Sequence, residues 1–235
     1  MLRPSAALQL SLVLSLTGCE TWVDGNGTPA TETRPLDGFS GVDSKGAFDV
    51  RVEQGDSFQV AINIDSNLLP LVETRIIGST LEITSDHHLE TNLPGPHVTV
   101  KMPEFSAAEL SGSGRLTVRS FQSTHPVSLH LSGSGAVDFD GTAPVVNADV
   151  SGSGDVNLAG KADEVRLDLS GSGVIDAANL PAQSGAVTLA GSGNVRATIN
   201  GPAAVSLSGS GEVDLYGDVR LEHSSKTGSG AIRVH

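Results

Sequence analysis

The sequence has few aromatic residues, almost no cysteine and a shortage of basic residues. Aromatic side chains make up only 3% of the 235 residues, so a hydrophobic core has to be built from Val, Leu, Ile and Ala, which pack in layers inside a narrow β structure. The single cysteine excludes an intramolecular disulfide framework. The formal net charge of −13 argues against a nucleic-acid partner, because phosphate binding requires a basic face.

The first 18 residues have the features of a signal peptide. Arg3 provides a short basic region, and residues 6–16 form an apolar segment without charge. An apolar run of 11 residues is too short to span a bilayer as a helix, but it matches the apolar region of an export signal. We therefore predict that residues 1–18 are a signal peptide and that the protein is exported.

The single cysteine follows this segment directly. The ending Leu16-Thr17-Gly18-Cys19 resembles a bacterial lipobox, and the resemblance implies lipidation of Cys19 and cleavage before it. Several acyl chains together would anchor the protein stably to a membrane. Because Glu20 rather than Asp follows the cysteine, the resemblance also implies the outer membrane if the source is Gram-negative. An ordinary secretory signal with a chance cysteine is the alternative.

The chain then changes its pattern twice. Residues 19–38 are rich in Thr, Gly and Pro and lack apolar periodicity, which predicts a flexible tether. Between residues 39 and 104, apolar and polar residues alternate, for example from Phe58 to Ile64, which predicts strands with one buried face. The segment 67–74 breaks this alternation and predicts a short helical turn. We interpret residues 39–104 as irregular opening strands of the domain that follows.

From residue 105 onward the chain repeats the tetrapeptide Ser-Gly-Ser-Gly. The intervals between successive copies are 18 to 21 residues, the length of one coil of a stacked β-solenoid. Perfect copies begin at Ser111, Ser132, Ser151, Ser170 and Ser208, and near copies begin at Ala190 and Thr227. The glycines that we assign to the turns of these coils are Gly112, Gly114, Gly133, Gly135, Gly152, Gly154, Gly171, Gly173, Gly191, Gly193, Gly209, Gly211, Gly228 and Gly230.

Pairs of apolar residues, spaced two apart, flank each motif. Leu129 and Leu131 precede the second motif, and Val137 and Phe139 follow it. Each pair points to one side of a strand, and glycine permits a corner where one backbone passes close to another. The predicted fold is all-β, a parallel β-helix with about 19–20 residues per coil in a single domain over residues 39–235, with regular repeats over 105–235.

Three features together resemble one protein family. They are the segment Phe48 to Gly55 followed by Leu81-Glu82-Ile83, the Met102-Pro103 step, and the Ser-Gly-Ser-Gly ladder. In these features residues 39–235 resemble the putative auto-transporter adhesin, head GIN domain family. The resemblance implies a right-handed β-helix-like domain on an exported lipoprotein, with an adhesin role and no established activity.

One loop has residue types that bind metals. His87, His88 and His97 cluster in the sequence with Asp86 and Glu90, and imidazole and carboxylate groups together are zinc ligands. A solvated polar loop is the alternative, and it is the interpretation that we favour. We accordingly expect no metal site, no cofactor and no catalytic residue.

A second set of polar residues would align if the coils stack. It stands three residues after the last glycine of each motif and includes the carboxylates Asp138, Asp176 and Asp214, which could bind calcium or a cationic ligand. The nonapeptide of calcium-binding β-rolls is absent, and two members are arginines, which favours a solvated strand face. The members are Thr117, Asp138, Asn157, Asp176, Arg196, Asp214 and Arg233.

These patterns favour a lipid-anchored cell-envelope protein whose β-helix is a non-catalytic scaffold for adhesion or interaction. The expected partners are the membrane, through the lipid anchor, and an envelope, polysaccharide or cell-surface ligand. Two alternatives stay open. One is a polysaccharide-active β-helix enzyme, which would need a cluster of carboxylates in a groove. The other is a purely structural envelope module.

The C-terminal end of the stack raises the question of self-association. Only five residues follow Gly230, too few for a capping element, and an uncapped β-helix exposes strand edges. Lys226 stands where the other coils have an apolar residue, so this coil should meet solvent. Either the end pairs with a second copy to form a homo-oligomer, or Lys226, Arg233 and His235 protect it by charge.

Overall fold

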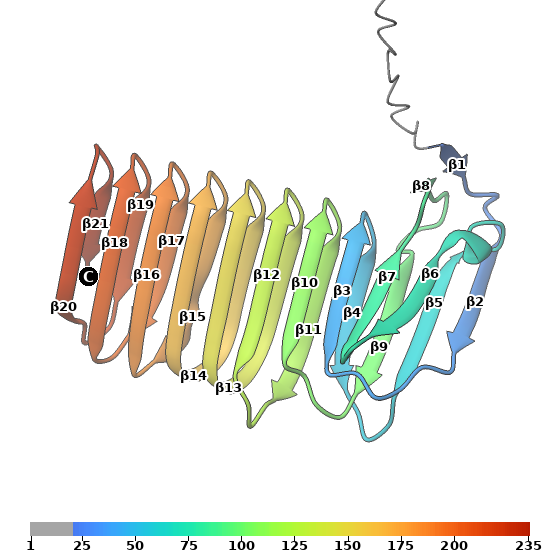
Figure 1. The fold of residues 1–235 in the computed structure, drawn as a ribbon, viewed down its shortest axis with the longest axis horizontal. Helices are drawn as coiled ribbons and strands as arrows, with labels where there is room; N and C mark the ends of the chain where they lie inside the picture. Colours follow the sequence, from blue (N-terminus) through green and yellow to red (C-terminus); the bar gives the residue numbers. More distant parts are fainter. Residues whose placement is uncertain (1–20) are drawn as a thin grey trace, which may run out of the picture.

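The computed structural model describes residues 21–235; the proposed signal peptide and the lipidation site Cys19 lie outside this range. The described chain is almost entirely β-structure. It has one short 3₁₀ turn, η1 (Leu69–Leu71), within the segment where a helical turn is predicted. No helix among these residues is long and apolar enough to cross a membrane. Figure 1 shows a row of parallel coils with a differently built cap at its N-terminal end.

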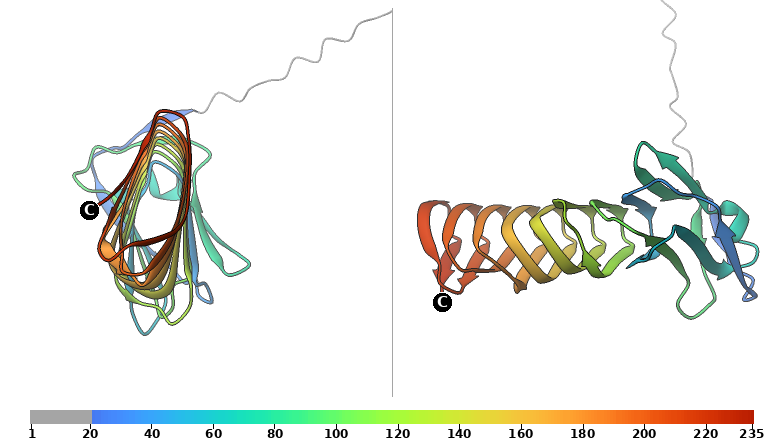
Figure 2. Two further views of the ribbon diagram at one scale, coloured as in Figure 1. Left: turned by 90° about the vertical axis from the view of Figure 1, so that its left-hand side faces the viewer. Right: turned by 90° about the horizontal axis from the view of Figure 1, so that it is seen from below.

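Residues 105–235, here called the repeat body, form a β-solenoid of about seven turns. In each coil a leading strand runs into the Ser-Gly-Ser-Gly turn and a trailing strand runs out of it. Seen along the stack, the coils superpose as a flattened ring (Figure 2). The strands are β10 (Ala107–Gly112), β11 (Arg115–Gln122), β12 (Val127–Gly133), β13 (Ala136–Gly152), β14 (Asp155–Gly171), β15 (Val174–Ala182), β16 (Ser184–Gly191), β17 (Asn194–Ile199), β18 (Pro202–Gly209), β19 (Glu212–Tyr216), β20 (Arg220–Thr227) and β21 (Ala231–Val234).

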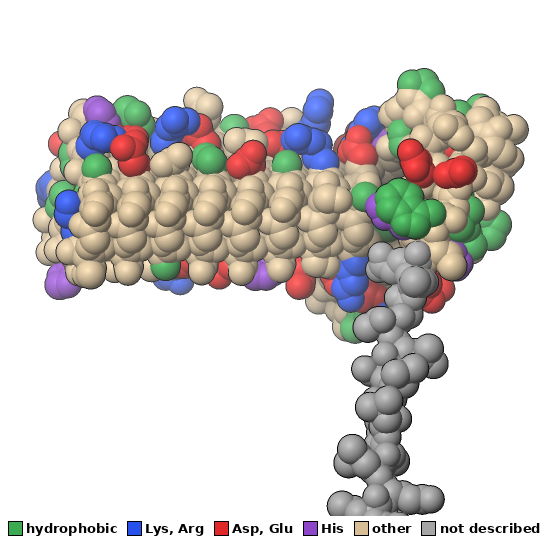
Figure 3. Space-filling view, turned by 90° about the horizontal axis from the view of Figure 1, so that it is seen from above, with side chains coloured by type: hydrophobic (Ala, Val, Ile, Leu, Met, Phe, Trp, Pro, Cys, Tyr) green, Lys and Arg blue, Asp and Glu red, His purple; other side chains and the backbone are tan. Residues whose placement is uncertain are grey.

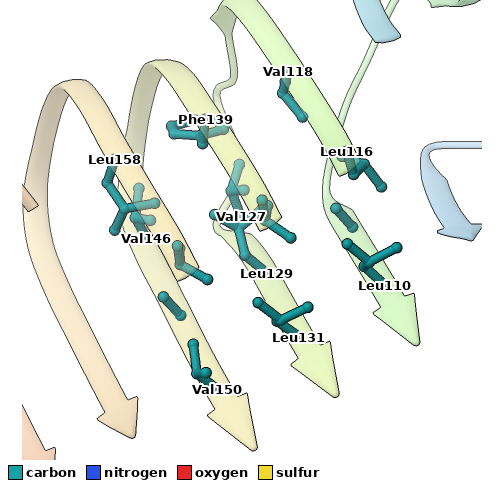
Figure 4. Close-up of a cluster of buried hydrophobic side chains, with 14 of the residues drawn as sticks. Leu110, Leu116, Val118, Val127, Leu129, Leu131, Phe139, Val146, Val150 and Leu158 are labelled. Atoms are coloured by element: carbon teal, nitrogen blue, oxygen red, sulfur yellow. The ribbon is translucent and has the colours of Figure 1, made fainter. Parts of the chain in front are cut away.

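Neighbouring coils pair in parallel and in register, motif upon motif. Gly112 lies opposite Gly133, which lies opposite Gly152, and the same pairing continues to Gly209. The flanking aliphatic residues therefore stack as well, and Leu131 pairs with Leu110 on one side of its strand. These side chains are buried between the leading and trailing strands (Figure 4). The β-helix predicted from the spacing is confirmed.

The two glycines of each motif meet different requirements. The first has a positive φ, 126° at Gly133, which L side chains rarely adopt. The second needs clearance, because a Cβ at Gly135 would lie 2.5 Å from the carbonyl oxygen of Gly114 in the coil before it. The motif is thus the corner that lets one coil lie directly on another.

Residues 21–104 form the N-terminal cap, in which two further coils lack the motif. β3 and β4 lie in register on β10 and β11, with Gly46 opposite Gly112. β7 and β9 lie in turn on β3 and β4. The strands of the cap are β1 (Trp22–Asp24), β2 (Pro29–Arg34), β3 (Gly41–Gly46), β4 (Asp49–Gln54), β5 (Gln59–Asp65), β6 (Glu73–Ile77), β7 (Thr80–Thr84), β8 (His88–Glu90) and β9 (His97–Met102).

The order of these coils in space differs from their order in the chain. The β3–β4 coil comes first in the sequence, but it is sandwiched between the β7–β9 coil and the first motif coil. Antiparallel strands then close the cap, since β6 pairs with β7, β5 with β9 and β2 with β5. Within residues 39–104, the strands β3, β4, β7 and β9 thus form coils of the stack, whereas β5 and β6 belong to an antiparallel closure.

The segment interpreted as a flexible tether instead contributes β1 and β2. β1 pairs in parallel with β8, and β2 pairs antiparallel with β5 over six residues. The polar composition of this segment did not indicate the strands, because both strands lie at sheet edges and keep much of their surface exposed. Their stability comes from partners that are distant in the sequence.

The C-terminal coil meets solvent, as Lys226 in an apolar position predicts. Every residue of β20 is exposed. Lys226 pairs with Leu207 of the coil before it, and its Nζ donates to the carbonyl oxygen of Gly230, 2.9 Å away. Arg233 makes an ion pair with Asp214 on β19 at 3.5 Å, and His235 Nε2 lies 3.0 Å from the same carboxylate. Arg233 and His235 thus connect the last coil to β19, whereas the contact of Lys226 lies within the last coil.

Candidate functional site

One irregular feature of the described chain is a cavity of about 300 Å³ in the N-terminal cap. Its apolar wall includes Ile62 and Ile64 from β5 and Val98 from β9. Phe48 and Val72 complete this wall. Polar groups are contributed by Lys45, Asp49, Asn63, His87, His88, Thr91 and His97. Its volume is at the lower end of the range for small-molecule pockets.

The cavity exists because one coil has a long loop in place of the motif. In the β7–β9 coil, residues 85–96 connect the leading and trailing strands, where every motif coil has a four-residue turn. This loop contains β8 and leaves the stack at the edge that carries the motif turns (Figure 1). The turn below it, from Gly46 to Phe48, forms part of the cavity lining.

Phe48 shows why the space is available. In the register between β4 and β11 it stands opposite Gly114, the second glycine of the first motif. A side chain at this position of a motif coil would collide with a carbonyl oxygen of the coil before it. Because the long loop replaces that coil's turn, a phenyl ring fits here, and the space beside it stays open.

The histidine cluster predicted from the sequence lies at this cavity. His97 Nδ1 is 2.8 Å from the carbonyl oxygen of Gly95, and the ring of His88 packs on Trp22 with the ring centres 3.7 Å apart. The backbone N–H of His87 donates to Ser85 Oγ. Among residues 21–235, no three His, Cys, Asp or Glu side chains are arranged to hold a metal ion. The loop therefore contributes imidazoles to a cavity lining.

Charged side chains fix the turn beside the cavity. Lys45 Nζ lies 2.5 Å from Glu82 Oε2 and 3.4 Å from Asp43 Oδ2. The hydrogen bond from Lys45 holds the pKa of Glu82 below its usual value, and Arg75 adds to the effect. Burial raises the pKa of Asp43, although Lys45 opposes this. Asp49, the carboxylate that lines the cavity, pairs with Arg51 at 3.2 Å.

The carboxylate column of the repeat body exists as the stacking predicts. Thr117 pairs with Asp138, and the register continues one coil at a time to Arg233. Each carboxylate has a cationic neighbour, since Arg115 pairs with Asp138 and Arg196 with Asp176. Hydrogen bonding to His235, and then to Arg233, holds the pKa of Asp214 below its usual value. This pairing within the chain is what a solvated, self-compensated strand face requires.

The edge formed by the motif turns has no charge of its own. Figure 3 shows this edge as a regular strip of backbone and small polar side chains, with charged residues on both sides of it. The motif serines of the central coils, such as Ser153 and Ser172, are exposed. The motif edge of the repeat body thus presents one surface unit many times, whereas the cavity lined by the histidines lies in the cap.

The fold and the cavity define a β-solenoid with a ligand-sized space in its cap. The chain belongs to the putative auto-transporter adhesin, head GIN domain family, whose model matches residues 38–218. This confirms the resemblance found in the sequence. The family's description is that of a cell-surface or exported adhesin.

Solved structures have the same fold at low sequence identity. A putative lipid binding protein from Parabacteroides distasonis matches with a TM-score of 0.74 and 22% identity, covering 92% of this chain and all of that one. A putative adhesin from Bacteroides fragilis matches with a TM-score of 0.75 and 20% identity, covering 91% of this chain and all of that one. No curated protein matches the sequence.

Proposed function

We propose that this protein is a lipid-anchored envelope protein that acts by binding, as a non-catalytic adhesion or interaction scaffold. The observation that carries the proposal is the stacking of the motif turns, which stay in register from Gly112 to Gly209 and place an exposed serine at the same edge of one coil after another. A surface of this kind suits an extended or repeated ligand, because each coil adds a weak contact and many contacts together give avidity. The adhesin description of the family supports the same conclusion.

The proposed lipid anchor is supported by the sequence that precedes the first strand. Cys19 follows an export signal with a lipobox ending, and the first described strand begins at Trp22. Labelling growing cells with an alkyne fatty acid should modify the wild-type protein and leave Cys19→Ala unlabelled. A wild-type protein that carries no label would contradict lipid anchoring.

The binding role is tested with the purified mature protein. We expect it to bind whole cells or isolated envelope polysaccharide, and we expect no cleavage of a glycan panel. Removing several central coils in register should weaken binding in proportion to the coils lost, because avidity depends on their number. Glycan cleavage would favour the enzyme alternative, and an absence of binding in every assay would favour a purely structural module.

The cavity supports a second candidate function, the binding of a small apolar ligand such as an acyl chain. Its wall is aliphatic and aromatic, with polar groups elsewhere in its lining, as in many small-molecule sites. One protein with the same fold is described as a putative lipid binding protein. We therefore expect displacement of a fluorescent fatty acid from the delipidated protein by unlabelled fatty acids.

A matched pair of substitutions tests this site. Ile64→Trp fills the cavity from its apolar wall and should abolish fatty-acid binding. Ile77→Trp makes the same change on β6, at a side chain that is 53% exposed and outside the cavity, and should leave binding unchanged. Equal binding by both variants would exclude the cavity as the site.

A further inference from the structure

The first strand of the fold is fixed to the cap from its first residues. The carbonyl oxygen of Thr21 accepts a hydrogen bond from the His88 N–H at 3.2 Å. Trp22 and Asp24 then pair with His88 and Glu90 across the β1–β8 ladder. β1 therefore has a defined position beside the cavity loop.

A buried carboxylate fixes the turn that follows β1. Asp65 has no solvent exposure, and its Oδ1 accepts from the Gly27 N–H at 2.5 Å. Its Oδ2 accepts from the Thr91 hydroxyl at 2.6 Å and so ties this turn to the cavity loop. Asn67 Nδ2 also donates to the carbonyl oxygen of Asp24 at 2.8 Å. Because β1 is held at both ends, the orientation of its side chains is fixed as well.

Trp22 is the most exposed large hydrophobic side chain of the described residues. Its side chain is 66% exposed, whereas Val23 on the opposite side of the strand packs against the core. Its ring packs on that of His88 with the two planes tilted by 45°, and His88 also lines the cavity. A tryptophan with an apolar ring and an N–H group is the side chain most suited to the headgroup layer of a membrane.

The distance to the proposed anchor is short. Only Glu20 lies between Cys19 and Thr21, and a fully extended chain spans at most about 7 Å over these two residue steps. Acyl chains on Cys19 would therefore hold β1 at the level of the lipid headgroups. We propose that the cap docks on the bilayer surface through Trp22, with the cavity loop beside the membrane; this rests on the lipid anchoring proposed above.

The charges around Trp22 indicate what kind of contact this is. Asp24 and Glu90 are exposed on the neighbouring strands, so the surface has no net attraction to anionic lipids. The contact should therefore depend on insertion of the indole ring and should not weaken at high salt, unlike a contact made by basic residues.

The single tryptophan makes a direct test available. Trp22 is the only tryptophan in the chain, so the fluorescence of the full mature lipoprotein reports its surroundings alone. We would reconstitute the protein into phosphatidylethanolamine–phosphatidylglycerol vesicles, with and without bromine on the acyl chains near the headgroup. Bromine quenches indole on contact, and we expect the brominated lipid to reduce the Trp22 emission roughly twofold at low and high salt.

The control moves the tryptophan to the other end of the molecule. Tyr216 lies on β19, six register steps from β4, about 29 Å along the stack at the usual strand spacing. The double variant Trp22→Phe, Tyr216→Trp should keep its full emission in brominated vesicles. Quenching of both proteins, or of neither, would overturn docking through the cap.

Flotation of the same vesicles separates the two proposals. Protein that floats with the vesicles but shows no quenching of Trp22 is anchored without docking, which overturns this inference and leaves the proposed function intact. Protein that fails to float is not anchored, which overturns the lipid anchor and the docking together.

Discussion

The repeat body and the N-terminal cap both contain coils with a leading and a trailing strand, but the two regions differ in how their strands pair and in what lies between them. In the body, the motif turns of successive coils stack in parallel and in register, and aliphatic side chains occupy the interior. In the cap, antiparallel strands close the stack, and a long loop leaves a cavity of about 300 Å³. The cap thus interrupts the repetition, and this cavity lies where it does so.

Buried polar groups separate the two regions further. The four buried polar or charged residues among residues 21–235 are Asp43, Ser44, Asp65 and Glu82, and all lie in the cap. Where the regions meet, Phe105 packs against Phe121 with the ring centres 5.3 Å apart. A solenoid interior is stabilised by stacked apolar layers, whereas the cap is specified by individual hydrogen bonds and ion pairs.

The largest effect is expected from removing the clearance between coils. A Cβ at Gly135 would lie 2.5 Å from the Gly114 carbonyl oxygen, which cannot move without breaking the stack. Gly135→Ala should lower the free energy of unfolding by about 4 kcal/mol, measured by urea denaturation. Gly55→Ala, in the cap, is the control; its added Cβ would be 3.7 Å from the nearest atom, and the change should stay within about 0.5 kcal/mol.

Truncating one aliphatic side chain in each region should give unequal losses. Leu131 is fully buried in the body, and Leu131→Ala should cost about 3 kcal/mol because it creates a new cavity. Ile64 lines a space that already exists, so Ile64→Ala should cost about half as much. Equal losses in urea denaturation would mean that the cap is packed as tightly as the body.

Stability should depend on pH through a buried carboxylate of the cap. Burial raises the pKa of Asp65, but hydrogen bonds from Thr91, Gly27 and Asn92 outweigh it and hold this pKa below the ordinary 3.8. A lowered pKa in the folded state means that the carboxylate stabilises the fold above the ordinary value and stops doing so as pH falls through the lowered one.

Asp65→Asn tests this assignment. It should lower Tm by several degrees at neutral pH, and the difference from wild type should shrink as pH falls below 3.8, in thermal unfolding followed by circular dichroism. Asp56→Asn changes an exposed residue in the turn between β4 and β5 and should shift Tm little throughout. A pH-independent loss for Asp65→Asn would assign its role to shape rather than charge.

The repeat body could be predicted from the sequence because one local rule is used many times. Motif spacing sets the coil length, and apolar pairs such as Leu129 and Leu131 set which side faces inward. Stacking of the motif turns then fixes the register beside each turn, and register shifts farther along the strands accommodate intervals of 18 to 21 residues. The outward column of Asp138, Asp176 and Arg196 followed directly from it.

The cap could be predicted only in part, because its contacts are made once and between distant segments. Alternation identified β4 and β5, but β9 lies between them, and no local pattern encodes that insertion. The β3–β4 coil does not match the repeat pattern, because Phe48 stands where a motif coil has its second glycine. The cavity was missed for the same reason, although the cluster of His87, His88 and His97 did identify the loop that lines it.

The smallest effect is expected from the charged column of the body. Asp176 lies 3.4 Å from Arg196, and both side chains are partly exposed. Water and salt screen such a pair, so Asp176→Asn should change the free energy of unfolding by less than about 0.5 kcal/mol in urea denaturation. Arg196→Gln is the matched change from the other side of the pair and should have an effect of similar size.

Calcium provides the sharper test of the same column. Arg115 and Arg196 already neutralise Asp138 and Asp176, so a divalent cation would have to displace a guanidinium group to bind. Adding calcium should therefore leave the Tm of wild type unchanged. A saturable rise in Tm that Asp176→Asn abolishes would instead make the column a cation site, because a ligand that binds only the folded state raises its stability. In that event the body would hold a specific site of its own, and the division between a uniform body and a specialised cap would no longer hold.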